Sequence, residues 1–92
     1  MKVLVKKESV EYSSETIEYK GNKFLIASRN GNCYSEVRIE IYTKNGDLAC
    51  IATGRDIPNT IYISYVEDDD KRLQKNAANL KAAEDYVKAI YG

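Results

Sequence analysis

Three short reversals that contain glycine punctuate the first half of the chain, and they constrain its fold more than any other feature. They are Gly21-Asn22, Asn30-Gly31 and Asn45-Gly46. Asn-Gly favours a two-residue type I′ turn and glycine in the first position a type II′ turn, and both turn types join antiparallel strands. The spacing therefore predicts β-hairpins in series, which make a meander.

The last of these hairpins sets the register of its two strands. With Asn45-Gly46 as a two-residue turn, Lys44 pairs with Asp47, Ile41 with Cys50 and Ile39 with Ala52. Successive side chains then point to opposite faces. One face carries Val37, Ile39, Ile41, Leu48, Cys50 and Ala52, and the other carries Glu36, Arg38, Glu40, Tyr42, Ala49 and Ile51. The apolar set is the expected core face.

The two upstream turns predict the same core face. Asn30-Gly31 places Phe24 opposite Val37, and Gly21-Asn22 places Ile17 opposite Ile26. A slip of one residue would turn a strand's apolar set outward, so the agreement of three turns supports this choice of face. On this register Cys33 and Cys50 lie about 27 Å apart, which is far beyond disulfide reach, and we expect two free thiols.

The ends of the strand region follow weaker signals. Residues 2–12 predict a first strand that carries Val3 and Val5, with Ser13-Ser14 as a break. Residues 54–59 predict a loop, because Pro58 cannot donate to a ladder. The stretch TIYISYV, residues 60–66, is rich in β-branched and aromatic residues and predicts one more strand.

The period changes in the last quarter of the chain. From Asp68 onward the apolar residues recur three and four apart, which is the spacing of one stripe on an α-helix. They are Leu73, Ala77, Leu80, Ala83, Val87 and Ile90, with Asn79 on the polar side. Glu67–Asp70 supplies an N-cap and negative charge at the helix start.

The expected fold class is therefore α+β. We expect a single domain, 1–92, made of an antiparallel β-meander of five to six strands at about 2–66 and one C-terminal α-helix at about 68–91. The apolar face of the sheet needs a cover, and the apolar stripe of the helix can provide it, so the helix should pack across that face.

Composition excludes several function classes. The 92 residues include 14 basic and 14 acidic side chains, so the overall charge attracts neither phosphate backbones nor anionic membranes. No apolar run approaches the ~20 residues of a membrane span, and charged residues follow MKVLV too soon for a signal peptide. We expect a cytoplasmic protein with no membrane contact.

No catalytic motif is apparent. The chain has no histidine and none of the usual nucleotide, hydrolase or paired-cysteine signatures, so we expect no enzyme, no catalytic residue, no cofactor and no metal ligand set. Glu67–Asp70 could hold Mg²⁺ or Ca²⁺, but it lacks the glycine and the spacing of a calcium loop. Helix capping is the favoured interpretation, and a small-ligand or metal-dependent protein that uses carboxylates stays an alternative.

The uncovered face of the predicted sheet is amphipathic. Tyr34 and Tyr42 lie on it beside aliphatic and charged residues, and tyrosine and arginine are favoured at interface centres. We predict that partner-binding residues come from this face and from an exposed 54–59 loop. They are Tyr34, Arg38, Glu40, Tyr42, Ile51, Arg55, Asp56 and Ile57. An ordinary solvated face is the alternative interpretation.

Together these observations favour a small non-enzymatic interaction protein that binds a protein partner. Inhibition of that partner, with a phage or mobile-element origin, is a hypothesis from composition, and a homodimer is a further use of the same surface. A single-stranded nucleic-acid-binding sheet is an alternative, because the expected fold resembles the Whirly single-stranded-DNA binders in outline. Against it, Lys20, Lys23 and Arg38 are opposed by Glu18, Glu36 and Glu40.

Overall fold

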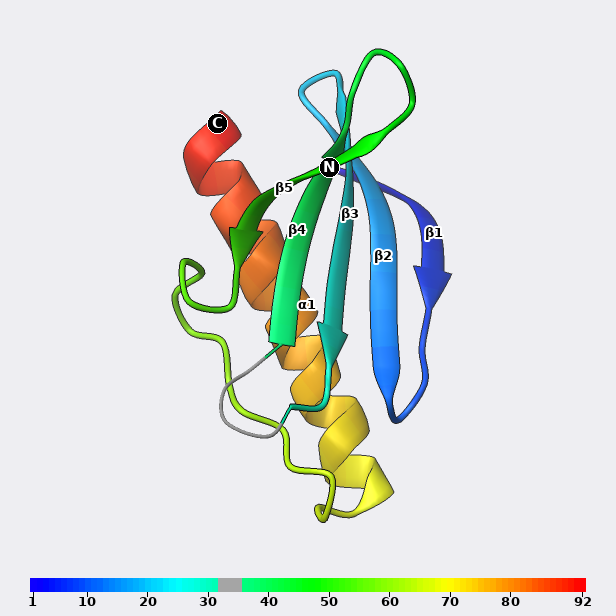
Figure 1. The fold of residues 1–92 in the computed structure, drawn as a ribbon, viewed down its shortest axis with the longest axis vertical. Coiled ribbons are helices and arrows are strands. Elements are labelled where there is room, and N and C mark those ends of the chain that lie inside the picture. Colours follow the sequence, from blue (N-terminus) through cyan, green and yellow to red (C-terminus); the bar gives the residue numbers. More distant parts are fainter. Residues whose placement is uncertain (32–35) are drawn as a thin grey trace.

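Five strands form one open antiparallel sheet, and a C-terminal helix covers one face of it, in a computed structural model that describes residues 1–31 and 36–92 (Figure 1). The elements are β1 (Lys2–Lys7), β2 (Tyr12–Tyr19), β3 (Asn22–Arg29), β4 (Glu36–Tyr42), β5 (Leu48–Thr53) and α1 (Asp69–Tyr91). The strands lie in chain order, β1-β2-β3-β4-β5. The predicted α+β meander is confirmed.

The core lies between the three central strands and the helix. α1 packs against β2, β3 and β4. The three central strands contribute Ile17, Phe24, Ile26, Val37 and Ile39 to this layer, β5 adds Ala52, and the helix contributes Leu80, Ala82, Ala83 and Val87. The ring of Phe24 meets Tyr91 edge-on at a centroid distance of 5.0 Å. The predicted core face is thus confirmed for these strands.

The first hairpin turns one residue earlier than expected. Lys20 and Gly21 both have positive φ, 53° and 81°, which is the signature of a type I′ turn. Ile17 consequently pairs with Phe24 instead of Ile26. The predicted partner is wrong by two residues, and because two is even the same side chains still face the core.

The second hairpin is wider than a two-residue turn. β3 ends at Arg29 and β4 begins at Glu36, and Phe24 pairs with Ile41 instead of Val37. The predicted partner is wrong by four residues, again an even number, so the face is kept. Cys33 and Tyr34, for which a free thiol and a partner contact were expected, lie outside the described residues.

The third hairpin departs from the prediction in two steps. Thr43 N donates to Asp47 O at 2.8 Å and Gly46 N donates to Thr43 O at 3.0 Å, with Gly46 at φ 85°. This is a three-residue loop in which glycine occupies the left-handed position. It pairs Ile41 with Ala49 rather than with Cys50.

A bulge then restores the predicted register. Glu40 pairs with Cys50 but Ile39 pairs with Ala52, which leaves Ile51 as the extra residue. Leu48 and Cys50 therefore lie on the outer face and are exposed, so their predicted core position is wrong. Ile51 packs against the core, so its predicted outer position is wrong as well.

Two predictions about the chain ends also fail. Ser13 and Ser14 are buried residues inside β2 and not a break. Residues 60–66 are not a strand, although Ile63 is completely buried. The helix binds part of the backbone of this segment, because the N–H and the C=O of Ile61 both form hydrogen bonds with the side chain of Asn79.

The helix begins as predicted but is rotated from the predicted stripe. Asp68 caps it by accepting from Lys71 N at 2.9 Å. Leu73 and Ile90 are 37% and 48% exposed, whereas Asn79, expected on the polar side, is completely buried. The first half of the buried face is polar, with Arg72, Asn76 and Asn79. These side chains hydrogen-bond with the backbone of Val10 and Ile61 and with the side chains of Glu11 and Ser28, and the spacing of apolar residues could not predict such contacts.

Candidate functional site

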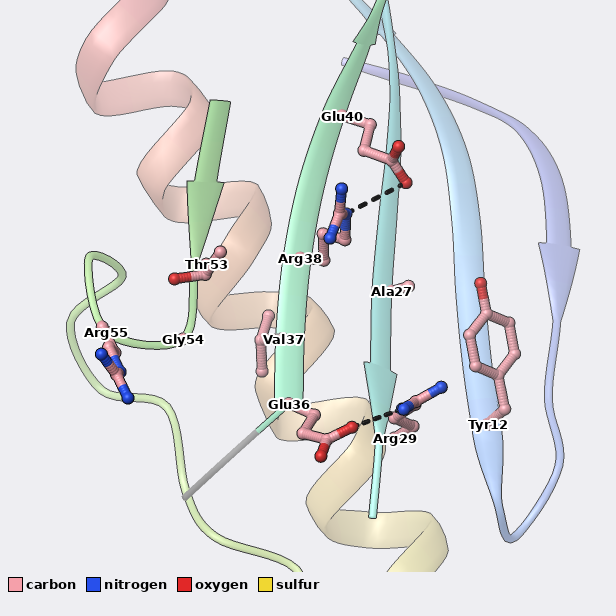
Figure 2. A pocket seen from close by; sticks show the side chains of 10 residues that line it. All are labelled: Tyr12, Ala27, Arg29, Glu36, Val37, Arg38, Glu40, Thr53, Gly54 and Arg55. Atoms are coloured by element: carbon pink, nitrogen blue, oxygen red, sulfur yellow. Dashed lines mark hydrogen bonds and ion pairs between the residues drawn. The ribbon is translucent and has the colours of Figure 1, made fainter. Parts of the chain in front are cut away.

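A hollow of about 640 Å³ lies on the outer face of the sheet, opposite the helix (Figure 2). It extends from the start of β2 across β3 and β4 to the end of β5 and the loop that follows. Its lining residues are Tyr12, Ala27, Arg29, Glu36, Val37, Arg38, Glu40, Thr53, Gly54 and Arg55. Such a concave surface with convergent polar groups is where a binding site is expected first.

Strand pairing places the polar side chains of this hollow. Arg29 is directly opposite Glu36, Ala27 is opposite Arg38, and Arg38 is also opposite Thr53 on the other side. The alternation of side chains directs all of them away from α1. Because Ala27 has only a methyl group, space remains between the two arginines of the strands.

The charges in the hollow are paired but weakly held. Arg29 Nε donates to Glu36, and this contact raises the pKa of Arg29. Arg38 Nε lies 3.6 Å from a carboxylate oxygen of Glu40. The arginine side chains are 62% and 56% exposed. Exposed ion pairs contribute only about 0–1 kcal/mol, so each guanidinium can exchange its carboxylate at small cost.

The outer face as a whole carries an excess of positive charge. Its strand residues include five cations against three carboxylates; they are Lys2, Lys7, Lys23, Arg29 and Arg38 against Glu18, Glu36 and Glu40. Arg55 adds a further cation at the rim of the hollow. The balanced face expected from the sequence is therefore wrong, because the position of β1 and of Arg29 was not counted.

The structure brings together some of the predicted partner-binding residues. Arg38, Glu40 and Arg55 line the hollow. Tyr42 is on the same face but at the other end of β4, where the ammonium of Lys23 lies 5.0 Å from the centre of its ring. These residues share one surface, as expected.

Other predicted residues serve the fold. The Asp56 carboxylate accepts from the backbone nitrogen of Thr53 at 2.9 Å and from its hydroxyl at 3.3 Å, which closes the turn after β5. Ile57 is 3% exposed and belongs to the core. Its expected exposure is wrong, because the turn closed by Asp56 directs Ile57 inward.

Tyr12 and Arg29 line the hollow and were missed. Arg29 has the same parity as Lys23, Leu25 and Ala27, so the alternation along β3 contained the signal. It was hidden because the Asn30-Gly31 turn was expected to start there. Tyr12 was hidden by the expected break at residues 13 and 14.

The acidic corner at residues 67–70 is occupied by contacts within the chain. Glu67 accepts a hydrogen bond from Lys75 and a second one from Ser64 N at 2.8 Å, and these hydrogen bonds lower its pKa. Asp68 is the helix cap. Within residues 1–31 and 36–92, no three histidine, cysteine or carboxylate side chains gather closely enough to hold a metal ion.

Two further observations bear on classification. In the part of the chain that the structure describes, no helix combines the length and the apolar character needed to cross a membrane. No family model, curated protein or solved structure matches the chain.

Proposed function

We propose that this chain is a small non-enzymatic protein that binds an acidic surface of a protein partner through the outer face of its sheet. The observation that carries the proposal is the hollow lined by three arginines and Tyr12. Arginine and tyrosine supply the large, rigid contacts that dominate binding energy at interfaces. A carboxylate-bearing partner suits these arginines, because a guanidinium group makes strong, charge-assisted and often bidentate hydrogen bonds with a carboxylate.

The weakness of the internal ion pairs supports this proposal. Arg29 and Arg38 hold Glu36 and Glu40 on an exposed surface, where water and salt screen the attraction. A partner that excludes water would strengthen its own contacts with these guanidinium groups, because the attraction between opposite charges is stronger where water is excluded.

We favour inhibition of the partner as the biological consequence of this binding. A protein that offers arginines to an acidic surface competes with any basic substrate or nucleic-acid-binding partner that uses the same surface. A short chain of this kind, with no histidine and no catalytic motif, suits a phage or mobile-element product that blocks host machinery.

Single-stranded nucleic acid is the second candidate, because the outer face carries more cations than carboxylates. Binding of this class needs aromatic platforms beside the basic groups. Tyr12 and Tyr42 are at opposite ends of the face, and one face of the Tyr42 ring is covered by Lys23. Two separated tyrosines of which one is partly covered make a poor stacking track, so the protein partner ranks first.

The test combines capture with paired variants. The wild-type chain is used as bait in a lysate of its source organism, the captured protein is purified, and its affinity for the chain is measured by calorimetry. We expect an R29A/R38A variant to bind at least tenfold more weakly, a loss of about 1.4 kcal/mol or more. The control is Lys81→Ala on the exposed side of α1, which should bind as the wild type does.

Salt and oligonucleotides separate the two candidates. Affinity for the protein partner should fall as salt rises, because the contacts are charged. Equal affinity of the wild type and R29A/R38A contradicts the proposal. Tight binding of labelled single-stranded oligonucleotides at low salt, lost in R29A/R38A and steeply salt-dependent, would replace it with the nucleic-acid candidate.

A further inference from the structure

The two edges of the sheet differ in charge. The β1 edge carries Lys2, Lys6 and Lys7, which is the kind of charge that discourages edge-to-edge pairing. β5, LACIAT, has no charged residue. An uncharged strand of alternating small and branched residues at an edge is open to pairing with another strand.

The hydrogen-bond pattern shows which groups of β5 point outward. Thr43 and Asp47 form a hydrogen-bonded pair at the end of the ladder, and Ile41–Ala49 is the next pair of this kind. Leu48 and Cys50, paired with Tyr42 and Glu40, occupy the alternate positions. Their backbone N–H and C=O groups therefore point away from β4.

No other described element covers this edge. The backbone of α1 lies close to β2, β3 and β4 but not to β5, although Ala52 at the end of β5 belongs to the core, and β5 ends the strand order of the sheet (Figure 1). Leu48, Ala49 and Cys50 are all exposed. The bulge at Ile51 bends the strand after them, so the open edge is a short stretch of three residues.

We propose that the β5 edge pairs antiparallel with β5 of a second copy of this chain, about a two-fold axis at Ala49. Leu48 then lies opposite the partner's Cys50, and Cys50 opposite the partner's Leu48. Both of these pairs are of the hydrogen-bonded kind, so the outward groups of Leu48 and Cys50 make four backbone hydrogen bonds across the axis.

The strand fits its own copy for two reasons. Ala49 meets the partner's Ala49 at the axis in a non-hydrogen-bonded pair, where strands approach most closely and a methyl group fits. The absence of charge means that no like charges face one another, whereas pairing of two β1 edges centred on Leu4 would bring Lys2 against Lys6 of the other copy. Continuation of the sheet also places both arginine-lined hollows on the same side.

Charge substitution at the axis tests the proposal. Light scattering of the wild type should show a mass that rises toward twice the monomer mass between about 10 µM and 1 mM, the range of a small, transient interface. Ala49→Lys and Ala49→Glu should each be monomeric, because each puts like charges directly opposite one another. A mixture of the two variants should restore the dimer, since unlike charges then meet.

The controls keep the result decisive. Ala78→Lys, on the exposed side of α1, should dimerise as the wild type does. The double variant Leu48→Glu/Cys50→Glu, in which each glutamate on the outer face lies opposite a glutamate of the partner, gives a second disruptive variant if Ala49→Lys fails to fold by circular dichroism. A wild type that is monomeric at 1 mM by the same measurement, or a dimer that persists in both disruptive variants, overturns the proposal. Neither outcome affects the binding test of R29A/R38A.

Discussion

The side-chain amide of Asn79 binds the backbone of Ile61 as a neighbouring strand would. Its Oδ1 accepts from Ile61 N at 2.7 Å, and its Nδ2 donates to Ile61 O at 2.9 Å. The same Nδ2 also donates to Ser28 Oγ at 3.2 Å, and Ser28 Oγ donates to Asn76 Oδ1 at 2.9 Å. A chain of buried polar groups thus joins α1, β3 and the segment after β5.

Removal of this amide should be costly. Asn79→Ala removes the hydrogen-bond partner of the Ile61 N–H and C=O, and it removes a donor to the completely buried Ser28 hydroxyl, which keeps only its bond to Asn76. Each unsatisfied buried group costs about 1–3 kcal/mol, so we expect the free energy of unfolding to fall by roughly 3 kcal/mol. Urea denaturation followed by circular dichroism measures it. Gln74→Ala, exposed on the same helix, is the control and should change stability by less than about 0.5 kcal/mol.

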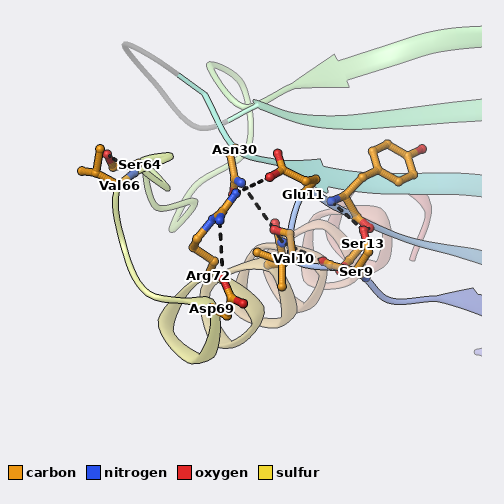
Figure 3. Close-up of polar contacts among 11 residues, drawn as sticks. Ser9, Val10, Glu11, Ser13, Asn30, Ser64, Val66, Asp69 and Arg72 are labelled. Carbon is orange, nitrogen blue, oxygen red and sulfur yellow. Dashed lines mark hydrogen bonds and ion pairs between the residues drawn. The ribbon is translucent and has the colours of Figure 1, made fainter.

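Arg72 anchors the first turn of α1 to the nearby end of the sheet, where β2 begins and β3 ends (Figure 3). It donates to Glu11 at 2.7 Å and lies 3.6 Å from Asp69. The Asn30 amide satisfies its surroundings when its oxygen and nitrogen are exchanged, and the oxygen then accepts from Arg72 Nε at 3.0 Å. The Arg72 side chain is only 9% exposed, whereas Glu11 is 69% exposed.

This asymmetry predicts different costs for the two partners. Arg72→Leu leaves the buried Asn30 side chain without its guanidinium partner, and we expect the free energy of unfolding to fall by about 2 kcal/mol. Glu11→Gln removes a partner that water can replace, so the loss should be below about 1 kcal/mol. Equal losses of stability in the two variants, measured by urea denaturation, would show that the Arg72–Glu11 ion pair stabilises the start of α1 and that the buried Arg72–Asn30 contact does not.

Glu15 makes the stability depend on pH. It is 5% exposed, and burial first, then a hydrogen bond with Glu84, raises its pKa to about 7. Lys6 opposes this shift and Glu8 adds to it, and Lys81 of α1 lines the same groove. The folded state therefore holds a proton that the unfolded chain releases near pH 4.5.

The sign follows from linkage. A raised pKa in the folded state makes the chain most stable below the unfolded value, and this stability is lost as the pH rises toward 7. We expect the free energy of unfolding to fall by about 1–3 kcal/mol between pH 5 and pH 8. Glu15→Gln should flatten this decrease, whereas the control Glu18→Gln, exposed on the same strand, should keep it. A decrease that is unchanged in Glu15→Gln would exclude this carboxyl group as its source.

The alternation of the strands was predictable from sequence, and the pairing of residues was not. Ile17, Phe24 and Ile39 face the core as expected because every error in the first two turns was an even number of residues. Only near Asn45-Gly46 did an odd shift occur, and there Cys50 moved to the outer face. Glycine marks a turn without fixing its length, since the left-handed residue can occupy different positions in different turns.

The polar contacts of the helix lay beyond sequence analysis. Asn79 and Arg72 interrupt the apolar spacing of α1, and such residues normally indicate a solvated face. They are buried because distant segments, around Ile61 and Asn30, present backbone and amide groups to them. For the hollow, Arg38 and Arg55 were predicted, whereas Arg29 and Tyr12 depended on strand bounds that turn signals misplaced by a few residues.

The most direct test of the outer-face proposal is an NMR titration of the chain labelled with ¹⁵N against the captured partner. We predict that the side-chain Nε–H signals of Arg29, Arg38 and Arg55 shift or broaden first, because these groups line the hollow. The amide signals of Lys81 and Lys88 on the helix should stay in place. Shifts confined to α1, with the three arginine signals unchanged, would contradict the account.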